Sequence, residues 1–305
     1  MEDELITLAS GRSRFRVAPA AGGSVTRYWR EGESADTALE WFRPAAPEDM
    51  AARAPTGMAC FPLVPYSNRI REGRFTFGGR RIALPLNFAP QRHALHGHGW
   101  QRPWVVAERV AARLVLDYVH GADDWPFPYR ARQTFALADD ALAISLAVEN
   151  TGTADMPVGL GLHPYFIRTP EARLTAAVEG MWLTDAEVMP TQHAAPPPPD
   201  RDPGRGIVLA RVALDNGYTG WRRRARIAWP EWNARLDMEA TAPLAFLVVY
   251  SPPDEDIFCV EPVSHMTDAF NRAAGGERDT GMMVIAPGEV ASATITFTPG
   301  EGRAA

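Results

Sequence analysis

Turn-forming residues interrupt this sequence too often for long helices. The 305 residues include 27 prolines and 25 glycines, which are the residues that most often end helices and mark turns. Between them lie short stretches in which apolar and polar side chains alternate, as in Arg74–Phe77 and Arg130–Leu137. Alternation with a period of two residues indicates strands that bury one face. We therefore expect an all-β fold with few short helices.

The same pattern predicts strands along most of the chain. Gly78 and Gly79 predict a hairpin turn after the first of these strands, and residues 244–250 are apolar enough to be buried on both faces. A short helix is expected at 267–271, and four consecutive prolines predict a stiff loop over Pro196–Arg205. The other predicted strands cover residues 14–17, 81–84, 112–118, 141–150, 173–178, 225–229, 234–238 and 291–297.

Composition excludes several classes of protein. With 46% hydrophobic and 22% charged residues the chain has ordinary globular composition, and without a repeat or linker we expect a single domain over residues 1–305. A formal net charge of -6 disfavours nucleic-acid binding, and no apolar stretch is long enough to cross a membrane. Two cysteines are too few for a disulfide framework, and the N-terminus lacks a secretory pattern. We expect a cytoplasmic protein.

One histidine and one glutamate share an unusual local setting. His163 follows an apolar glycine-rich run and precedes Pro164, which restricts the histidine backbone to extended conformations. Glu261 likewise follows an apolar strand end and precedes Pro262. Each is either a structural residue with satisfied polar atoms or a group positioned to transfer a proton. Burial raises the pKa of a carboxyl group, which suits a general base that works near neutral pH.

Three further histidines, His93, His96 and His98, lie within six residues of one another. The H-x-H pair resembles the metal motif of cupins, but that motif requires a glutamate soon afterwards and the first one here is Glu108. Alternatively, the intervening glycines let the backbone approach a ligand, while the imidazoles donate hydrogen bonds. Trp100 then offers an apolar ring to the C–H face of a sugar.

Two more polar residues lie beside predicted strands. Arg69 follows Asn68 just before the strand at Arg74, where its planar guanidinium can bind a sugar hydroxyl or an anion, or form a structural ion pair. Asp215 stands at the head of a predicted turn over residues 214–221. It either caps that turn through its own side chain or contributes an acceptor to a site.

Taken together, five segments resemble the aldose 1-epimerase family, also called galactose mutarotases. They occur in the family's order and span nearly the whole chain. The resemblance implies a β-supersandwich of mostly antiparallel strands, with a shallow sugar cleft on a concave face and neither a metal nor an organic cofactor. The segments are Asn68-Arg69, the block around His96, His163-Pro164-Tyr165-Phe166, Asp215 and Glu261-Pro262.

The resemblance also implies a role for each residue. His163 would be the general acid that protonates the ring oxygen, and Glu261 the general base that takes the proton of the anomeric hydroxyl. Opening a cyclic hemiacetal requires both proton transfers, so an acid and a base on opposite sides of one sugar supply the catalysis. Hydroxyl groups would be held by Arg69, His96 and Asp215, with a stacking ring from Trp100 or Trp125 and a further contact from His98.

The substrate is left open by departures from the family pattern. Where many members have Asn-His-Leu-His-Gly-Gly and Asn-His-x-Tyr-Phe, this chain has His-Ala-Leu-His-Gly-His and Leu-His-Pro-Tyr-Phe. These blocks are similar to a divergent bacterial branch that includes hexose-6-phosphate epimerases and sulfoquinovose mutarotases. Arginines such as Arg69, Arg71 and Arg92 would read a phosphate or sulfonate, or else lie on the surface.

We therefore expect a mutarotase that acts on an aldohexose or a derivative, as a monomer or a homodimer. A non-catalytic sugar-binding protein on the same fold is the first alternative, because a fold does not determine function. The joint presence of His163 and Glu261 argues against it. A cupin-like metalloenzyme that uses His93, His96 and His98 is the second alternative.

Overall fold

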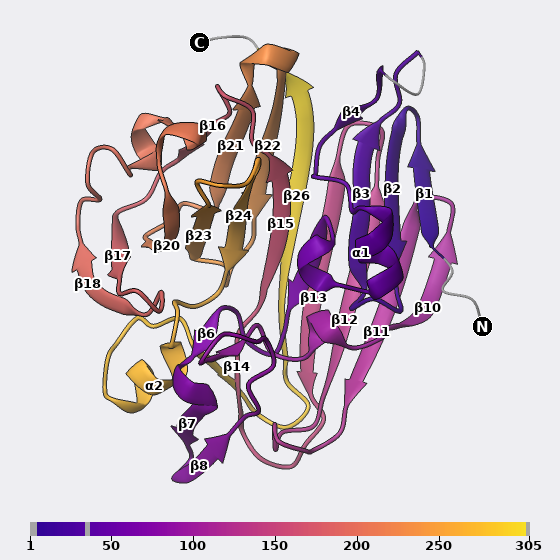
Figure 1. The fold of residues 1–305 in the computed structure, drawn as a ribbon. Coiled ribbons are helices and arrows are strands. Elements are labelled where there is room, and N and C mark those ends of the chain that lie inside the picture. The colour runs from indigo at the N-terminus through magenta and orange to yellow at the C-terminus, as the bar shows by residue number, and fades with distance from the viewer. Residues whose placement is uncertain (1–4, 34–36, 303–305) are drawn as a thin grey trace.

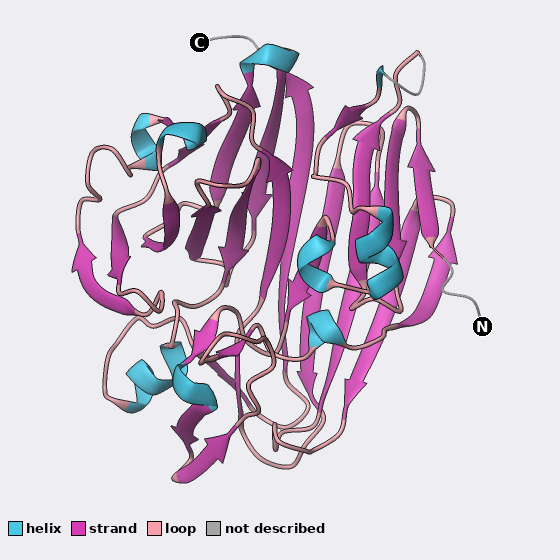
Figure 2. Cartoon of the chain, in the orientation of Figure 1, coloured by secondary structure: helices cyan, strands magenta, loops and turns pink. Residues whose placement is uncertain are grey.

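A computed structural model describes residues 5–33 and 37–302 of the chain (Figure 1). It consists of 48% strand and 11% helix, and its strands are mostly antiparallel (Figure 2). Two large sheets lie face to face, as Figure 1 shows. The prediction of an all-β sandwich with few short helices is confirmed.

The first large sheet contains eleven strands, and each neighbouring pair is antiparallel. It brings together strands from both halves of the chain. In spatial order it contains β1 (Ile6–Ser10), β2 (Ser13–Ala18), β3 (Ser24–Arg30), β5 (Cys60–Leu63), β15 (Gly161–Ile167), β24 (Ile257–Val263), β23 (Phe246–Ser251), β20 (Leu214–Thr219), β17 (Gly180–Thr184) and β18 (Pro190–Ala194), with β4 (Leu39–Glu40) beside β3.

The second large sheet contains nine strands, and the last strand of the chain lies at its centre. In spatial order it contains β10 (Val105–Val110), β11 (Arg113–His120), β12 (Tyr129–Leu137), β13 (Leu142–Asn150), β26 (Val290–Glu301), β22 (Ala234–Ala240), β21 (Arg224–Trp229), β16 (Arg173–Ala176) and β19 (Ile207–Val208). Three small pairs are β6 (Arg69–Ile70) with β9 (Ala94–Leu95), β7 (Arg74–Phe77) with β8 (Arg80–Ala83), and β14 (Met156–Val158) with β25 (Met283–Ile285).

Helices are few and short. The expected helix at 267–271 is present as α2 (Ala269–Ala274), while α1 (Pro47–Ala52) was not predicted. Its start is nevertheless marked in the sequence, because proline in the first turn followed by two acidic residues favours a helix N-terminus. Within residues 5–33 and 37–302, no helix has the length and apolarity that a bilayer crossing requires. In the described part of the chain, 3-10 turns are found at Pro55–Gly57, Arg71–Gly73, Gly99–Gln101, Pro203–Arg205, Leu209–Arg211 and Pro230–Trp232.

Aromatic side chains fill the space between the two large sheets. Phe15 of β2 packs on Phe135 of β12 with ring centroids 5.3 Å apart, and Phe166 of β15 lies 6.3 Å from Trp229 of β21. Successive residues of a strand point to opposite faces, so His163 and the other odd-numbered residues of β15 lie on the face turned away from this core. The outer face of the eleven-stranded sheet is therefore available for a site.

The predicted turn at 214–221 is wrong, because this segment forms β20 and turns only afterwards, at Gly220. Burial alternates along the strand, which places Asp215 on one face and Tyr218 on the other. The Tyr218 hydroxyl donates a hydrogen bond to the Arg201 carbonyl at 2.7 Å. The loop over Pro196–Arg205 is thus attached on the face opposite Asp215.

The glycine-rich run before His163 is required by close packing. A Cβ atom on Gly159 would lie 1.9 Å from the ring of His265. This buried imidazole accepts a hydrogen bond from the Ser67 backbone at Nε2, 3.1 Å away, and its Nδ1 lies 2.7 Å from the Met266 carbonyl. Since Nε2 is the acceptor, Nδ1 carries the proton and donates to that carbonyl. His265 therefore links two loops as a neutral group.

This neutral, buried histidine makes an acid-sensitive contribution to stability. Burial lowers the pKa of His265 from 6.5 to about 4, so the unfolded chain binds a proton in this range that the folded chain does not. We expect its share of the free energy of unfolding to be complete above pH 6.5 and to fall by about 2 kcal/mol at pH 5. Urea unfolding of wild type and His265→Gln at pH 7.5 and pH 5 measures this difference. An equal pH dependence in the two proteins would contradict the assignment.

Candidate functional site

A cavity of about 530 Å³ opens on the outer face of the eleven-stranded sheet. This volume lies within the range of small-molecule sites in proteins. Five neighbouring strands, β5, β15, β24, β23 and β20, form its floor, and the loops around residues 43–57, 68–69 and 88–100 form its walls. The floor contributes Phe61, His163, Tyr165, Glu261, Tyr250 and Asp215.

Strand register places His163 directly beside Glu261. Gly161 pairs with Val263 and Tyr165 with Cys259, so the residues between them, His163 and Glu261, face each other across β15 and β24. His163 Nε2 lies 3.4 Å from Glu261 Oε1, and the side chains are 10% and 3% exposed. The structure thus brings together two residues that are 98 positions apart in the sequence.

Burial shifts the pKa values of this pair in opposite directions. Desolvation lowers the pKa of His163 to about 3, and the positive charges of Arg43 and Arg69 act in the same direction. Desolvation raises the pKa of Glu261 well above its usual value, with a further increase from the negative charge of Asp215 and a decrease from Arg69. Both shifts disfavour the charged forms. The two shifts therefore favour the uncharged arrangement of the pair, with one proton on Glu261, over the ion pair.

Several polar atoms around this pair have no hydrogen-bond partner among the described residues. They are Nδ1 of His163, Oε2 of Glu261 and Nε of Arg69. Buried polar groups in proteins are nearly always hydrogen-bonded, and leaving one unpaired is costly. A hydroxyl-rich ligand in the cavity would supply the missing donors and acceptors.

His96 is held in one tautomer at the cavity wall. Its backbone N–H donates to the Asn68 carbonyl at 2.9 Å, and the Asn68 N–H donates to His96 Nδ1 at 3.0 Å. Burial lowers the pKa of His96 well below its usual value, and the nearby His163 and Arg69 add to the shift. Because Nδ1 accepts, Nε2 carries the proton of the neutral ring. The residue therefore presents one N–H donor.

Arg69 and Asp215 form a second polar pair beside His163 and Glu261. The Arg69 guanidinium lies 3.7 Å from Asp215 Oδ2 and donates to the Asn68 side-chain oxygen at 3.1 Å. Asn68 has a left-handed backbone, with φ of 55°, which asparagine tolerates better than most residues. Arg69, His96 and Asp215, which were predicted from separate segments, all line the one cavity with His163 and Glu261.

The aromatic rings that line the cavity differ in how accessible they are to a ligand. Trp100 lines the cavity but is fully buried, with its ring 5.2 Å from that of Phe61. The more accessible rings belong to Phe88 and Tyr250, which are half-buried and line the cavity. Neither was predicted: Phe88 carries no local signal, and Tyr250 reaches the site only because it pairs with Asp215 across β23 and β20.

Trp125 and His98 do not line this cavity. Trp125 is fully buried among aromatic rings, with Phe75 5.6 Å and Tyr66 5.9 Å away, so it is a core residue and we withdraw it as a sugar contact. His98 stacks instead on His120, at a centroid distance of 4.6 Å. Both were expected from the resemblance to the family, and a sequence resemblance does not show the direction of a side chain.

The three histidines of the 93–98 segment also separate in space. His96 faces the cavity, His98 packs on His120, and His93 lies 3.5 Å from Glu187. Among the described residues, the groups whose donor atoms are close enough to share a metal do not combine these three. The cupin-like arrangement of His93, His96 and His98 is therefore not formed, because the backbone directs each imidazole to a different neighbour.

The arginines proposed to read an anion are already paired with carboxylates. Arg71 lies 3.7 Å from Asp268, and Arg92 lies 3.2 Å from Glu187. Neither lines the cavity. Arg43, which was not predicted, does line it, but its guanidinium donates to the backbone carbonyls of the 56–58 loop and lies 4.6 Å from the Tyr165 ring.

The tip of the β17–β18 hairpin forms one wall under backbone strain. Val188 lines the cavity with φ of 61°, a conformation that β-branched residues rarely adopt. The tip is held by Asp185, whose side chain accepts hydrogen bonds from the Glu187 and Met189 backbones. Glu187 then contacts His93 across the cavity edge. Strained residues cluster at ligand sites because the surrounding structure maintains them.

A second groove, of about 1150 Å³, lies along Trp182 and the 277–283 segment. Its carboxylates and its histidine, His193, are exposed or half-buried, so it lacks a buried imidazole–carboxylate pair.

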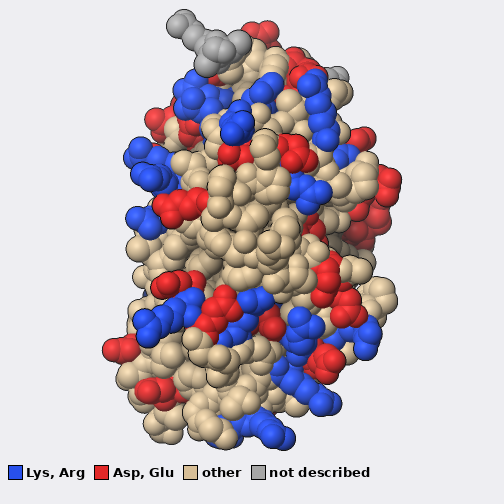
Figure 3. Space-filling model, turned by 90° about the vertical axis from the view of Figure 1, so that its left-hand side faces the viewer, with Lys and Arg blue, Asp and Glu red and all other residues tan. Residues whose placement is uncertain are grey.

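Figure 3 views the side on which β17, β18 and α2 lie, and basic and acidic side chains alternate over this face. A surface of mixed charge offers no continuous basic path to a phosphate backbone.

Comparison with known proteins identifies a family for this arrangement. The sequence profile of the family named aldose 1-epimerase matches residues 4–298. The chain is similar to YphB, an uncharacterized protein of Escherichia coli K12, with 33% identity over 300 residues, which is 96% of this chain and 98% of the relative. It is also similar to galactose mutarotase of Mus musculus, with 29% identity over 143 residues, which is 43% of this chain and 40% of the relative.

Solved structures agree with this assignment. A candidate aldose 1-epimerase from Escherichia coli K12 superposes with a TM-score of 0.87 and 31% identity over 98% of this chain and 99% of that one. A galactose mutarotase-like protein from Clostridium acetobutylicum gives a TM-score of 0.82 at 19% identity, over 98% and 96% of the two chains. At this lower identity the likeness shows the fold alone.

The strained backbone of Val188 predicts that its substitution by glycine affects stability and ligand binding differently. Val188→Gly removes the left-handed penalty of a β-branched residue, so we expect the free energy of unfolding to stay the same or rise by roughly 1 kcal/mol. The loss of an apolar wall should at the same time weaken ligand binding. Urea unfolding and ligand titration measure the two effects.

Val178→Gly is the matched control, because this half-buried loop valine has no left-handed backbone and its substitution should destabilise. An equal loss in the free energy of unfolding from both substitutions would show that the Val188 backbone is not strained.

Proposed function

This chain belongs to the aldose 1-epimerase family, and from that premise we propose that it is a mutarotase interconverting the α and β anomers of a neutral aldose. The observation that carries the proposal is the register of β15 and β24, which sets His163 3.4 Å from Glu261 inside a cavity of sugar size. No metal or organic cofactor takes part in the proposed reaction.

Mutarotation requires one proton to be removed and one to be supplied. Glu261 takes the proton of the anomeric hydroxyl as the general base, and His163 gives a proton to the ring oxygen as the general acid. The C1–O5 bond breaks and leaves an open-chain aldehyde. Rotation about C1–C2 then presents the other face of the carbonyl group. Reclosure with the two roles reversed yields the other anomer and returns both residues to their starting state.

The proton content of the pair suits this exchange. Burial of both groups favours the uncharged arrangement in the free site, with the single proton on Glu261. Transfer of that proton to His163 creates the acid and the base in one step, across the 3.4 Å between Oε1 and Nε2. The reaction consumes no net proton, so one shared proton is sufficient for the whole cycle.

The remaining polar residues of the cavity orient the sugar. Arg69 and the Nε2 of His96 supply donors, and Asp215 supplies an acceptor. Charge-assisted hydrogen bonds of this kind are stronger than neutral ones and are directional. The half-buried rings of Phe88 and Tyr250 offer apolar surface to the C–H face of a pyranose.

The charges around the cavity favour a sugar without an anionic group. Two arginines line it, and Arg69 is already paired with Asp215. Four carboxyl groups line it as well, from Asp49, Asp215, Glu255 and Glu261. A phosphate or sulfonate would meet more negative than positive charge, and like charges repel at close range. We therefore favour a neutral aldose over a hexose phosphate or a sulfonated sugar.

Anomer equilibration tests the reaction and the base together. Freshly dissolved pure α anomers of neutral, 6-phosphorylated and 6-sulfonated aldohexoses are mixed with the protein and followed by NMR. We expect acceleration with a neutral sugar, and a fall in kcat of roughly 10² to 10⁴ in Glu261→Gln with the affinity for the sugar largely kept. Glu239→Gln, on the exposed face of β22, is the matched control and should retain the wild-type rate.

Three outcomes contradict these assignments. Equilibration of every sugar at the uncatalysed rate would refute the enzyme activity. A full rate in Glu261→Gln would refute the base. Faster turnover of the phosphorylated or sulfonated sugar than of the neutral one would refute the substrate class. It would require a cation free to bind the anion, whereas Arg69 pairs with Asp215 and Arg43 donates to backbone carbonyls.

The pH dependence of kcat/KM tests the proton content. A second proton binds the pair only near the lowered pKa of His163, about 3, and the single proton is retained well above the usual pKa of a carboxyl group. We therefore expect kcat/KM not to fall as the pH is lowered from 7 to 5, once the uncatalysed rate is subtracted. A fall in rate on the acid side with a midpoint near 6.5, the ordinary value for histidine, would show that His163 titrates as an exposed group.

A further inference from the structure

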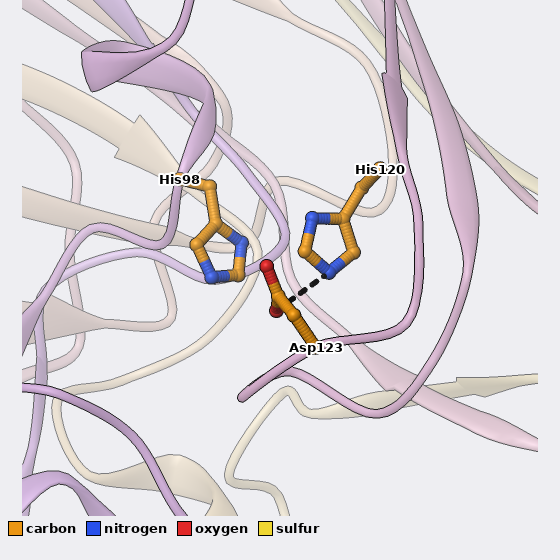
Figure 4. A group of neighbouring side chains, drawn as sticks. All are labelled: His98, His120 and Asp123. Atoms are coloured by element: carbon orange, nitrogen blue, oxygen red, sulfur yellow. Dashed lines mark ion pairs between the residues drawn. The ribbon is translucent and has the colours of Figure 1, made fainter.

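A second histidine cluster lies outside the sugar cavity and has no part in the proposed reaction. His98 from the segment after β9, His120 at the end of β11 and Asp123 from the next loop converge there, as Figure 4 shows. Their donor atoms all lie within 4.8 Å of one another. His120 is 4% exposed, whereas the Asp123 side chain is 55% exposed, so the cluster runs from the core to the surface.

One nitrogen of this cluster faces two oxygen atoms. His120 Nε2 lies 3.3 Å from Asp123 Oδ1 and 3.1 Å from the Trp125 carbonyl oxygen. The His98 ring lies nearly parallel to that of His120, at 9°, beside the Asp123 carboxylate (Figure 4). A cation in place of the proton on His120 Nε2 would therefore meet two imidazole nitrogens and two oxygens.

We propose that His98, His120 and Asp123 bind one divalent first-row transition-metal ion, with the Trp125 carbonyl as a fourth donor. Three side-chain ligands of the His₂-carboxylate type are the usual set for zinc and related ions. Calcium and magnesium prefer oxygen donors throughout. Tetrahedral zinc would need the donors about 3.3 Å apart, and Asp123 lies on an exposed loop from which its carboxylate can close on the imidazoles.

A tyrosine hydroxyl lies beside each imidazole of the cluster. Tyr118 and Tyr129 place their hydroxyls 3.4 Å from Nδ1 of His120 and of His98, respectively. Such outer hydrogen bonds orient imidazole ligands in metal sites.

The consequence of metal binding would be structural. His98 lies two residues after His96 and two before Trp100, so an ion at this cluster would tie the wall of the sugar cavity to the end of β11. Any ligand that binds only the folded state raises the free energy of unfolding according to its concentration and affinity. The thermal midpoint should therefore rise with added metal.

The experiment uses the full chain, purified with its tag removed and dialysed against EDTA. Zn²⁺ is titrated by calorimetry and Co²⁺ by its visible absorption, with thermal unfolding measured alongside. We expect one ion per chain and a higher thermal midpoint with Zn²⁺. Asp123→Asn and His98→Gln should each weaken binding by at least about 10-fold. His193→Gln, at an exposed histidine outside both sites, should bind as wild type does.

Two results overturn the proposal. The first is the absence of Zn²⁺ and Co²⁺ binding by the folded wild type. The second is equal binding by wild type, Asp123→Asn and His98→Gln, which would place the ion elsewhere, for example at the donor group of His163, Cys259 and Glu261. Asp123→Asn keeps the side-chain oxygen that accepts from the Trp125 backbone N–H at 3.0 Å, so it separates loss of a ligand from loss of the fold.

Discussion

The candidate active site depends on the pairing of two strands whose other face belongs to the core. On the cavity side β15 and β24 carry His163 and Glu261, and on the core side they carry Phe166 and Phe258, whose rings stack at 5.3 Å. A register shift of one residue in either strand would move the titratable group of that strand to the wrong face and its phenylalanine out of the core. Hydrophobic packing therefore fixes the distance between His163 and Glu261.

The same packing explains the proton chemistry of the pair. Side chains on a central strand of a wide sheet are desolvated by their neighbours on either side, and both members of this pair are almost fully buried. Desolvation then shifts both pKa values in the direction that favours the uncharged forms. The stability of the sheet and the reactivity proposed for the site thus arise from one arrangement.

The sequence predicted those features that depend on local pattern. Alternation and breakers predicted the all-β fold, and Pro164 correctly placed His163 on a strand. Local pattern failed where long-range pairing decides the outcome. Asp215 was assigned to a turn but lies on β20, and Tyr250 enters the site only through its pairing with that strand. The direction of these side chains could not be predicted either. Trp125 and His98 are turned away from the cavity by contacts with residues that lie outside their own sequence segments.

The position of β26 determines when the nine-stranded sheet can form during synthesis of the chain. This last strand lies between β13 and β22, so residues 290–301 join two groups of strands that are otherwise unconnected in the nine-stranded sheet. Until it is synthesised, β13 and β22 each present an open edge, and open edges recruit other strands. Residues 290–301 must therefore leave the ribosome before the sheet behind the cavity has a continuous centre.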